Sequence, residues 1–422
     1  MQRFPFIDSL APKFLLDKVW VTKNLNKFRK LFTIHMTSID PRQASKVKYP
    51  SQEIMFLLIY GIFVGCRDIE SIVDLLRDGS PHIAELRKMF RYKNLNMSRK
   101  PIDQLLQRID SQQFAAFIFL LRKEILNHIG EKINSKIGMP RYSIDGKYVN
   151  GSHKGTPKRT GYNIVNIYDT DNQVFLGSMV VDDKKNERSA ARALIPELAD
   201  RYALFTGDAL YTEKSIIRLI VENGCEYVLP VKHNNKASHA DIESFFRYAN
   251  DNPSDVEIDE HVIDWHREKD YMVKKVVLST TEKGWFDYLP FDNVATIGMM
   301  TTYRRYVGQK DKNEKESVQI RYFVSSLCLT SEQLWDIVLE HWQIEEAHSR
   351  MDRHYYEDAR HLSNKNAVKI MNELIKLVDY VVLVASSVIE KKRDRRSVSD
   401  ILRYLRRNVQ SFMNVFALCI ST

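Results

Sequence analysis

Three acidic residues stand in settings that suit one shared metal site. Asp145 and Asp208 each end a short apolar run, as residues at the tips of strands do, and Glu345 lies inside a long helical pattern. Cleavage of a phosphodiester needs an activated oxygen nucleophile and a stabilised leaving oxygen, and two Mg²⁺ ions ~4 Å apart can supply both. Mg²⁺ prefers hard oxygen ligands, so a few carboxylates suffice. Together with the basic charge of the chain, the three acids favour metal-dependent cutting and joining of DNA.

Each acid also has a simpler interpretation. An Asp beside Gly is commonly a turn residue, and both Asp145-Gly146 and Gly207-Asp208 fit that description. Glu346 competes with Glu345, because neighbouring helical residues lie only ~100° apart around the axis. Spacing alone leaves these alternatives open.

Two histidines and an aspartate share the expected helical face with Glu345. His341, His348 and Asp352 lie at −4, +3 and +7 from it. The histidines could contact phosphate, orient water or simply pack. The compact ligand spacing of a zinc protease does not occur here.

The charge balance points to a polyanionic partner. The 422-residue chain carries a net charge of +9. Basic residues outnumber acidic ones most clearly in residues 1–50, 146–168 and 390–407. Such clusters can neutralise DNA phosphates, although solvated surface lysines explain any single cluster equally well. We take Lys147, Lys154 and Lys232 as candidate phosphate contacts.

The remaining composition is that of an ordinary globular protein, with 44% hydrophobic and 28% charged residues. The four cysteines are far apart, without a CxxC pair, which argues against structural zinc and favours free thiols in a reducing cytosol. The first residues lack the order of a signal peptide, and the longest apolar stretch, 54–66, is too short to span a bilayer. We therefore expect a cytoplasmic protein, associated with the bacterial nucleoid when bound to DNA, and no membrane partner.

Apolar periodicity divides the chain into three parts. Residues 1–137 read as a helical N-terminal domain. Residues 138–362 give three strands, a helix, a strand, a helix and a strand, followed by a β-rich insertion at about 235–330 and a helix from Ser331 to about Arg360. Residues 363–422 add one or two C-terminal helices. Short connections suit an antiparallel meander and helices impose parallel crossovers, so we expect an α/β fold with a ribonuclease H-like mixed sheet.

In ten short segments the chain resembles DDE-type insertion-sequence transposases, in the branch that includes the H-repeat-associated proteins. The matching segments occur in order along most of the chain, at residues 49–50, 65–70, 144–147, 151–152, 185–187, 207–212, 227–232, 322–327, 341–345 and 356–359. The chain departs from the family in three ways. Glu346 stands where Asn is usual, and the spacing from Glu345 to the later Glu-Asp pair is one residue short. In the related Tyr-Arg-Glu-Lys signature, His341 occupies the Arg position and Asp352 the Lys position.

The resemblance implies a ribonuclease H-like core and two Mg²⁺ ions, or Mn²⁺ in their place, held by Asp145, Asp208 and Glu345, which it favours over Glu346. It implies hydrolysis at the ends of the protein's own element, followed by attack of the 3′-hydroxyl on target DNA. The expected partner is double-stranded DNA, bound by a homodimer because both ends must be held together. A relic that binds DNA without cleaving it, and a stand-alone metal-dependent nuclease, remain the alternatives.

Overall fold

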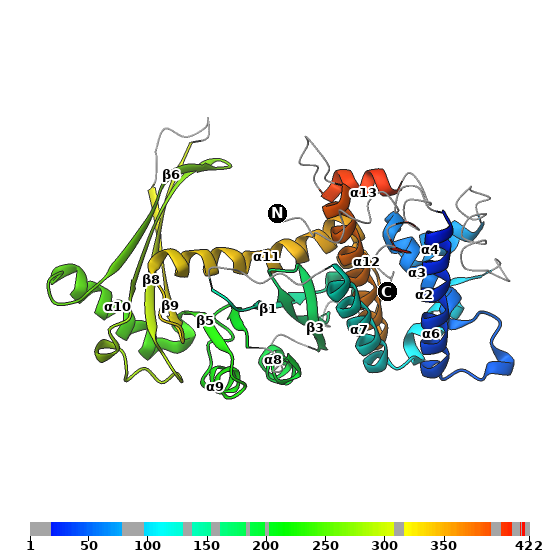
Figure 1. The fold of residues 1–422 in the computed structure, drawn as a ribbon, viewed down its shortest axis with the longest axis horizontal. Helices are drawn as coiled ribbons and strands as arrows, with labels where there is room; N and C mark the ends of the chain where they lie inside the picture. The colour runs from blue at the N-terminus through cyan, green and yellow to red at the C-terminus, as the bar shows by residue number, and fades with distance from the viewer. Residues whose placement is uncertain are drawn as a thin grey trace.

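The computed structural model describes most of the chain, and the structural statements below concern the described residues. These are residues 18–77, 97–129, 137–152, 161–182, 186–198, 202–307, 316–389 and 398–406, with 414, 416 and 417. A nine-stranded sheet occupies one part of the molecule and a bundle of helices the other, and the long helix α11 (Ser331–Tyr355) runs from the sheet to the bundle (Figure 1).

The sheet has the strand order β3-β2-β1-β4-β5-β9-β8-β7-β6. Its strands are β1 (Arg141–Tyr148), β2 (Asn163–Asp169), β3 (Val174–Val181), β4 (Leu204–Gly207), β5 (Glu226–Val231), β6 (Asp259–Glu268), β7 (Tyr271–Thr280), β8 (Thr296–Tyr306) and β9 (Glu316–Ser325). The pairings of β1 with β2 and of β2 with β3 are antiparallel, whereas β1, β4 and β5 are parallel neighbours. The predicted mixed α/β sheet is confirmed, and short connections explain its antiparallel half because a parallel pair needs a longer crossover.

Helices cover both faces of this sheet. On one face α8 (Glu187–Leu194), α9 (Lys214–Glu222) and α10 (Lys236–Asp251) share a core with the apolar residues of β1, β4 and β5. On the other face α11 contributes Leu334 and Ile337 to a separate core. α11 begins where the sequence predicts, because Thr330 accepts a hydrogen bond from the backbone of Gln333 and the Gln333 side chain returns one, forming a capping box.

The helical bundle joins the two ends of the chain. Its helices are α2 (Lys18–Ile39), α3 (Ser51–Val64), α4 (Ile69–Arg77), α6 (Arg99–Arg108), α7 (Ser111–Ile129), α12 (Lys365–Ile389) and α13 (Val398–Arg406). The 3-10 turns are Ala44–Lys46, Asn150–Ser152, Pro196–Leu198, His233–Asn235, Lys283–Trp285 and Glu357–Ala359. One hydrophobic core unites α2, α3, α7 and α12 with one face of β2 and β3. Within the described residues, no helix has the length and apolar content to cross a membrane.

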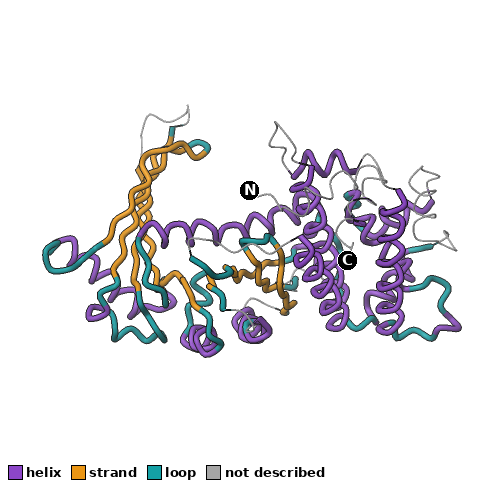
Figure 2. Tube along the Cα trace, in the orientation of Figure 1, coloured by secondary structure: helices purple, strands orange, loops and turns teal. Residues whose placement is uncertain are grey.

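The predicted insertion holds one helix and one strand that the sequence pattern did not predict. The helix is α10, whose buried residues include Ile242, Phe245 and Phe246. The strand is β6, an edge strand that is largely exposed and charged, so it lacks the apolar alternation by which strands are predicted. Beyond the helices the outer parts of β6–β9 project as a tall ribbon (Figure 2). We call residues 261–276, 301–307 and 316–321 the β-arm.

A buried polar stripe on α12 ties the bundle to the sheet. Glu373 pairs with Arg122 of α7 at 2.9 Å, and Lys376 donates to Asn166 of β2 at 2.6 Å. Further along, Asp379 accepts a bidentate pair of hydrogen bonds from Arg350 of α11. Buried charges are tolerated only when they are paired and hydrogen-bonded, so these contacts fix how α12 sits against β2 and α11.

The buried lysine of this stripe gives stability a specific pH dependence. Burial lowers the pKa of Lys376 from 10.5 to about 8, against the opposing pull of Glu373. Between these values the unfolded chain holds a proton that the folded chain has released, so stability rises with pH, by at most about 1.4 kcal/mol per pH unit. Below the folded value both states are protonated, and the contribution is constant.

We therefore expect Lys376→Met to remove a rise in the free energy of unfolding that the parent protein shows between about pH 8 and about pH 10. Guanidinium unfolding of both proteins at the two pH values measures the difference, and taking the difference cancels groups that titrate in both. An identical pH dependence in the two proteins would contradict the buried-lysine assignment.

Candidate active site

α11 lies along β1 on one face of the sheet, with matching contacts at successive positions. Arg141 pairs with Glu340, Asp145 with His348, and Lys147 with Asp352. Four helical residues rise about 6 Å and two strand residues about 6.7 Å, so alternate residues of β1 meet successive turns of α11. This match places His341, Glu345 and His348 over the sheet.

Asp145 lies within β1 and not at the tip of a strand as expected, whereas Asp208 directly follows β4. Ile144 of β1 pairs with Gly207 of β4, so Asp145 and Asp208 are the next residues in the same register. Two residues earlier on the same face, the hydroxyls of Ser143 and Thr206 lie 2.9 Å apart. Adjacent strands are about 4.8 Å apart, so the register brings both carboxylates to one edge. β1 and β4 are thus neighbours in the sheet.

The glycines beside the aspartates have different structural roles. Asp145-Gly146 is not a turn, because both residues lie within β1. A Cβ on Gly146 would come 2.6 Å from the carboxyl carbon of Glu187, so glycine admits that buried side chain. Asp208, in contrast, does begin a turn: its Oδ1 accepts a hydrogen bond from the backbone N–H of Leu210 at 2.7 Å.

A pocket of about 260 Å³ opens beside Asp208. It is lined by two acids, Asp208 and Glu345, and by two cations, Lys232 and Arg321, together with His341. The rest of its wall consists of Thr206, Gly207, Val228, Pro230, Phe323, Val338 and Trp342. The helix thus brings Glu345 into the same pocket as Asp208, whereas Glu346 is exposed outside that lining and pairs with Arg353 at 2.7 Å. Acids and cations facing one cavity suit a metal-bound phosphate.

His341 forms part of the pocket wall and is held by the sheet. Its Nδ1 lies 3.0 Å from the hydroxyl of Thr206. Burial lowers the pKa of His341, and the charges of Asp145 and Asp208 only partly oppose this effect. The imidazole therefore stays neutral at pH 7, and both aspartates lie close enough to act on it.

His348 holds Asp145 through a chain of buried contacts. Its Nδ1 lies 3.3 Å from Oδ2 of Asp145, and its Nε2 lies 2.9 Å from the amide nitrogen of Asn166. Because Lys376 donates to the amide oxygen of Asn166, the amide nitrogen faces His348 and donates to Nε2. That leaves the proton of a neutral His348 on Nδ1, directed at Asp145. Both ring nitrogens of His348 therefore contact other residues of the protein.

Lys147 is also committed to internal partners. Its ammonium contacts Asp352 and Glu357, and its side chain is only 8% exposed. Burial alone would lower the pKa of Lys147, but the carboxylates of Glu357 and Asp352 outweigh burial and raise that pKa. Meeting a DNA phosphate would require breaking this buried cluster, so we leave Lys147 out of the DNA-contact proposals below. Lys232 is exposed in the pocket, and Lys154 lies outside the described residues.

The carboxylates suit a hard divalent cation in donor type, and they lie in one region, since Asp208 and Glu345 share a pocket and Asp145 is in register beside Asp208. They are not drawn together into a finished cage: within the described part of the chain, no group of three or more His, Cys, Asp or Glu could hold a metal ion as it stands. Glu345 is exposed and makes no hydrogen bond or ion pair with the other described residues, so it can turn towards a ligand.

Asn166 and Arg321 were not among the predicted site residues, although the sequence around each indicates a role. Asn166 is a polar residue in the middle of β2, a strand that is buried along its whole length. A polar side chain in such a strand needs a buried partner, which here is His348. Arg321 interrupts the apolar end of β9, and only the pairing of β9 with β5 brings it to the pocket.

Lys147 and Lys232 should have different roles, the first in stability and the second in DNA binding. We expect Lys147→Met to lower the free energy of unfolding by about 3–5 kcal/mol, because it leaves buried carboxylates without their cation. Lys232→Met should leave stability unchanged within about 0.5 kcal/mol and weaken binding to duplex DNA, because Lys232 is exposed in the pocket. Chemical unfolding and fluorescence anisotropy measure the two effects. Lys147→Met with unchanged stability and weakened DNA binding would contradict this division.

The chain matches a family model described as "Transposase DDE domain" over residues 135–378, and one described as "DDE_Tnp_1-associated" over residues 35–120. It is similar to "Putative transposase YncI" of Escherichia coli O157:H7, with 26% identity covering 80% of this chain and 83% of that protein. It is also similar to "H repeat-associated putative transposase YhhI" of Escherichia coli strain K12, with 23% identity covering 79% and 85%. A cryo-EM structure of a piggyBac transposase synaptic complex with hairpin DNA aligns with a TM-score of 0.43 and 11% identity, covering 96% of this chain and 80% of that one. The chain belongs to the transposase DDE domain family.

Proposed function

We propose that the protein cleaves DNA at the ends of its own insertion element and joins the resulting 3′-hydroxyl ends to target DNA. The observation that carries the proposal is the pocket in which Asp208 and Glu345 face Lys232, with Asp145 in register beside Asp208. Family membership supports transposition as the process, and the acids and cations around one cavity support phosphodiester chemistry inside it.

In this proposal Asp145, Asp208 and Glu345 hold two Mg²⁺ ions, or Mn²⁺ in their place. When bound, such ions activate the attacking oxygen and stabilise the leaving oxygen of an in-line displacement. The residues of the chain position these donors: His348 directs an N–H at Asp145, and the backbone of Leu210 holds one oxygen of Asp208. Glu345 completes the set by turning towards the strand ends.

Lys232 supplies positive charge beside the reacting phosphate, because it is exposed on the wall that also bears Asp208. His341 stays neutral through burial and so adds no positive charge to the pocket. With His341 in place of the arginine of the related signature, this wall depends on other residues for its cations.

The partners follow from the same reaction. Double-stranded DNA serves as element end and as target, and a homodimer holds the two ends together. We assign end binding to the helical N-terminal domain, whose early residues are rich in Lys and Arg. The cell compartment expected for such a reaction is the cytoplasm, where the protein would meet the nucleoid.

The rival function is DNA binding without cleavage. The observation that favours it is that the three carboxylates do not form a ready-made cage within the described residues. The two functions differ in one product: the transposase nicks the element end in Mg²⁺ or Mn²⁺, and the relic binds it intact. A nuclease without strand joining would give nicks but no joined products.

We expect Asp145→Asn, Asp208→Asn and Glu345→Gln each to abolish nicking of a duplex that carries an end of the element, while retaining most of the binding affinity. Removing a carboxylate ligand removes the metal-dependent step but few phosphate contacts. Gel analysis of nicked and joined products, with electrophoretic mobility shifts for binding, measures both effects.

Glu346→Gln is the matched control, since it makes the same change one residue along the same helix, at a carboxylate that pairs with Arg353 instead of lining the pocket. It should nick at a rate within a few-fold of the parent protein. Normal nicking by Glu345→Gln together with loss in Glu346→Gln would overturn the assignment of the third acid.

A further inference from the structure

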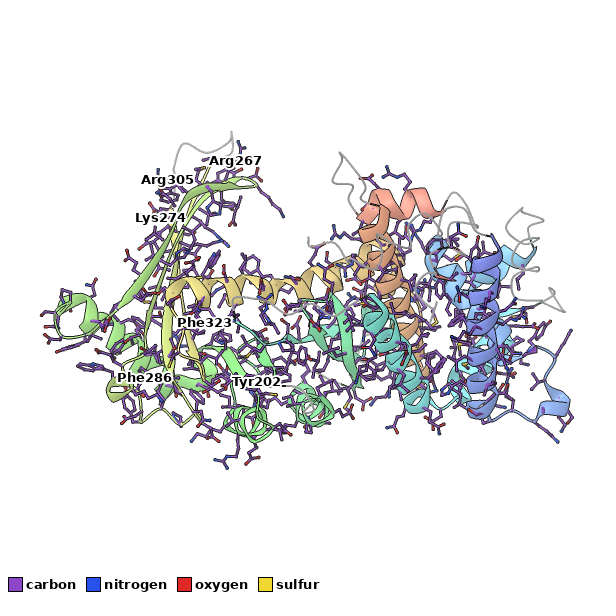
Figure 3. The ribbon with its side chains drawn as sticks, viewed as in Figure 1. Tyr202, Arg267, Lys274, Phe286, Arg305 and Phe323 are labelled. Carbon is purple, nitrogen blue, oxygen red and sulfur yellow. The ribbon has the colours of Figure 1, made fainter. Side chains whose placement is uncertain are left out.

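The two faces of the β-arm differ in what they meet. On β8 the even-numbered residues face α11: a Cβ on Gly298 would come 2.2 Å from Leu334, and Met300 shares a core with Leu334 and Ile337. Side chains alternate along a strand, so Arg304 lies on the same face as Gly298 and Met300, whereas Arg305 lies on the opposite face. Figure 3 labels Arg305 on the arm.

The register extends this α11-facing side to β9. Arg321 pairs with Met300 and Ser317 pairs with Arg304, so Arg321 and Arg304 lie on one face. They are separated by four residues along the strand direction, or about 13 Å. Arg321 lines the pocket with Asp208 and Glu345, and Arg304 therefore lies further up the arm on the same side.

Neither guanidinium has an ion-pair partner within the described residues, and the charge of Glu345 acts on Arg321 only from a longer distance. Within the described residues, Arg321 donates only to the amide oxygen of Gln319, at 3.3 Å, and no carboxylate lies within 4 Å of Arg321 or Arg304. Arg305, on the other face, does have such a partner, since it lies 3.6 Å from Glu316. Two cations held near one another without an ion-pair partner repel, and an external anion relieves this repulsion.

We propose that Arg321 and Arg304 form a phosphate track along the α11-facing side of the β-arm, on which the DNA backbone runs from the reacting phosphate in the pocket up the arm. The inference rests on the proposed function for the identity of the anion. The register places their backbone positions about 13 Å apart along the strand direction. The long side chains can therefore contact two different phosphates of one DNA backbone, which carries a charge on every nucleotide. Arginine forms bidentate hydrogen bonds with phosphate, which fixes position as well as charge.

The phosphate track supplies positive charge that α11 does not bring to the pocket. Along α11, His341 and Asp352 occupy positions where the related signature has Arg and Lys. Arg321 reaches the same pocket from β9 instead. It is a positioning residue: it would hold the strand that carries the reacting phosphate, without taking part in bond making.

The first test compares two faces of one strand. Arg304→Gln and Arg321→Gln are measured against Arg305→Gln, which makes the same charge change beside Arg304 on the opposite face. The probe is a fluorescent duplex of mixed sequence, titrated at several salt concentrations. Removing one arginine–phosphate interaction should make the negative slope of log affinity against log salt shallower by about 0.9. The variant that carries both Arg304→Gln and Arg321→Gln should therefore be shallower by about 1.8, and Arg305→Gln should keep a slope close to that of the parent protein.

The second test uses neighbouring residues of β9 as cross-linking sites in a protein with every arginine intact. Ser317 and Val318 are both exposed, and they face opposite sides because Ser317 pairs with Arg304 and Val318 with Tyr303. A photoactivatable residue at 317 should cross-link the duplex several-fold more than one at 318. This measurement needs no arginine variant, so it remains decisive if Arg321→Gln fails to fold. In that case Arg321→Lys should fold and should keep part of the salt dependence of binding.

The outcomes separate this inference from the proposed function, because binding and cross-linking need no cleavage. A higher cross-linking yield from 317 than from 318 would support the track even if the DNA is not nicked. Equal slopes for Arg304→Gln, Arg321→Gln and Arg305→Gln, or equal cross-linking from 317 and 318, would overturn it, and so would cross-links from 317 to a second copy of the chain instead of DNA.

Discussion

The structure depends on the match between two repeats, that of strand β1 and that of helix α11. Arg141, Asp145 and Lys147 are spaced along the strand so that each meets an acid or a histidine on a successive part of the helix. These contacts fix the helix along its axis, and one further consequence is the placement of Glu345 in the pocket beside Asp208. A slip of one helical turn would exchange every partner at once, and it would leave Lys147 and Asp145 facing unsuitable neighbours in a buried setting.

A second set of contacts connects α12 of the helical bundle to Asp145. Lys376 on α12 holds the amide of Asn166, that amide holds His348, and His348 holds Asp145. The helical bundle therefore acts on Asp145 within β1 through two hydrogen bonds and a final contact between His348 and the carboxylate. Because Glu373 of the same stripe pairs with Arg122 of α7, the bundle also fixes the position of α12. The position of Asp145 therefore depends on the helical bundle as well as on the sheet.

Much of this could be predicted from the sequence, and the exceptions have physical reasons. The strands with apolar runs and the start of α11 at Ser331 were predicted because periodicity and capping are local. β6 was not, since an exposed charged edge strand has no apolar alternation, and α10 was hidden in a polar stretch although Ile242, Phe245 and Phe246 have helical spacing. The internal role of Lys147 could not be predicted, because its partner Glu357 lies 210 positions away.

The most direct test of the shared metal site is cleavage of the polypeptide itself by bound Fe²⁺. In place of Mg²⁺, Fe²⁺ with ascorbate and peroxide breaks the backbone close to the ion, and the breaks can be mapped by mass spectrometry. Our account predicts breaks near Asp145, Asp208 and Glu345 together, all suppressed in parallel by excess Mg²⁺. Breaks confined to one of these three segments, or breaks that persist in excess Mg²⁺, would contradict it.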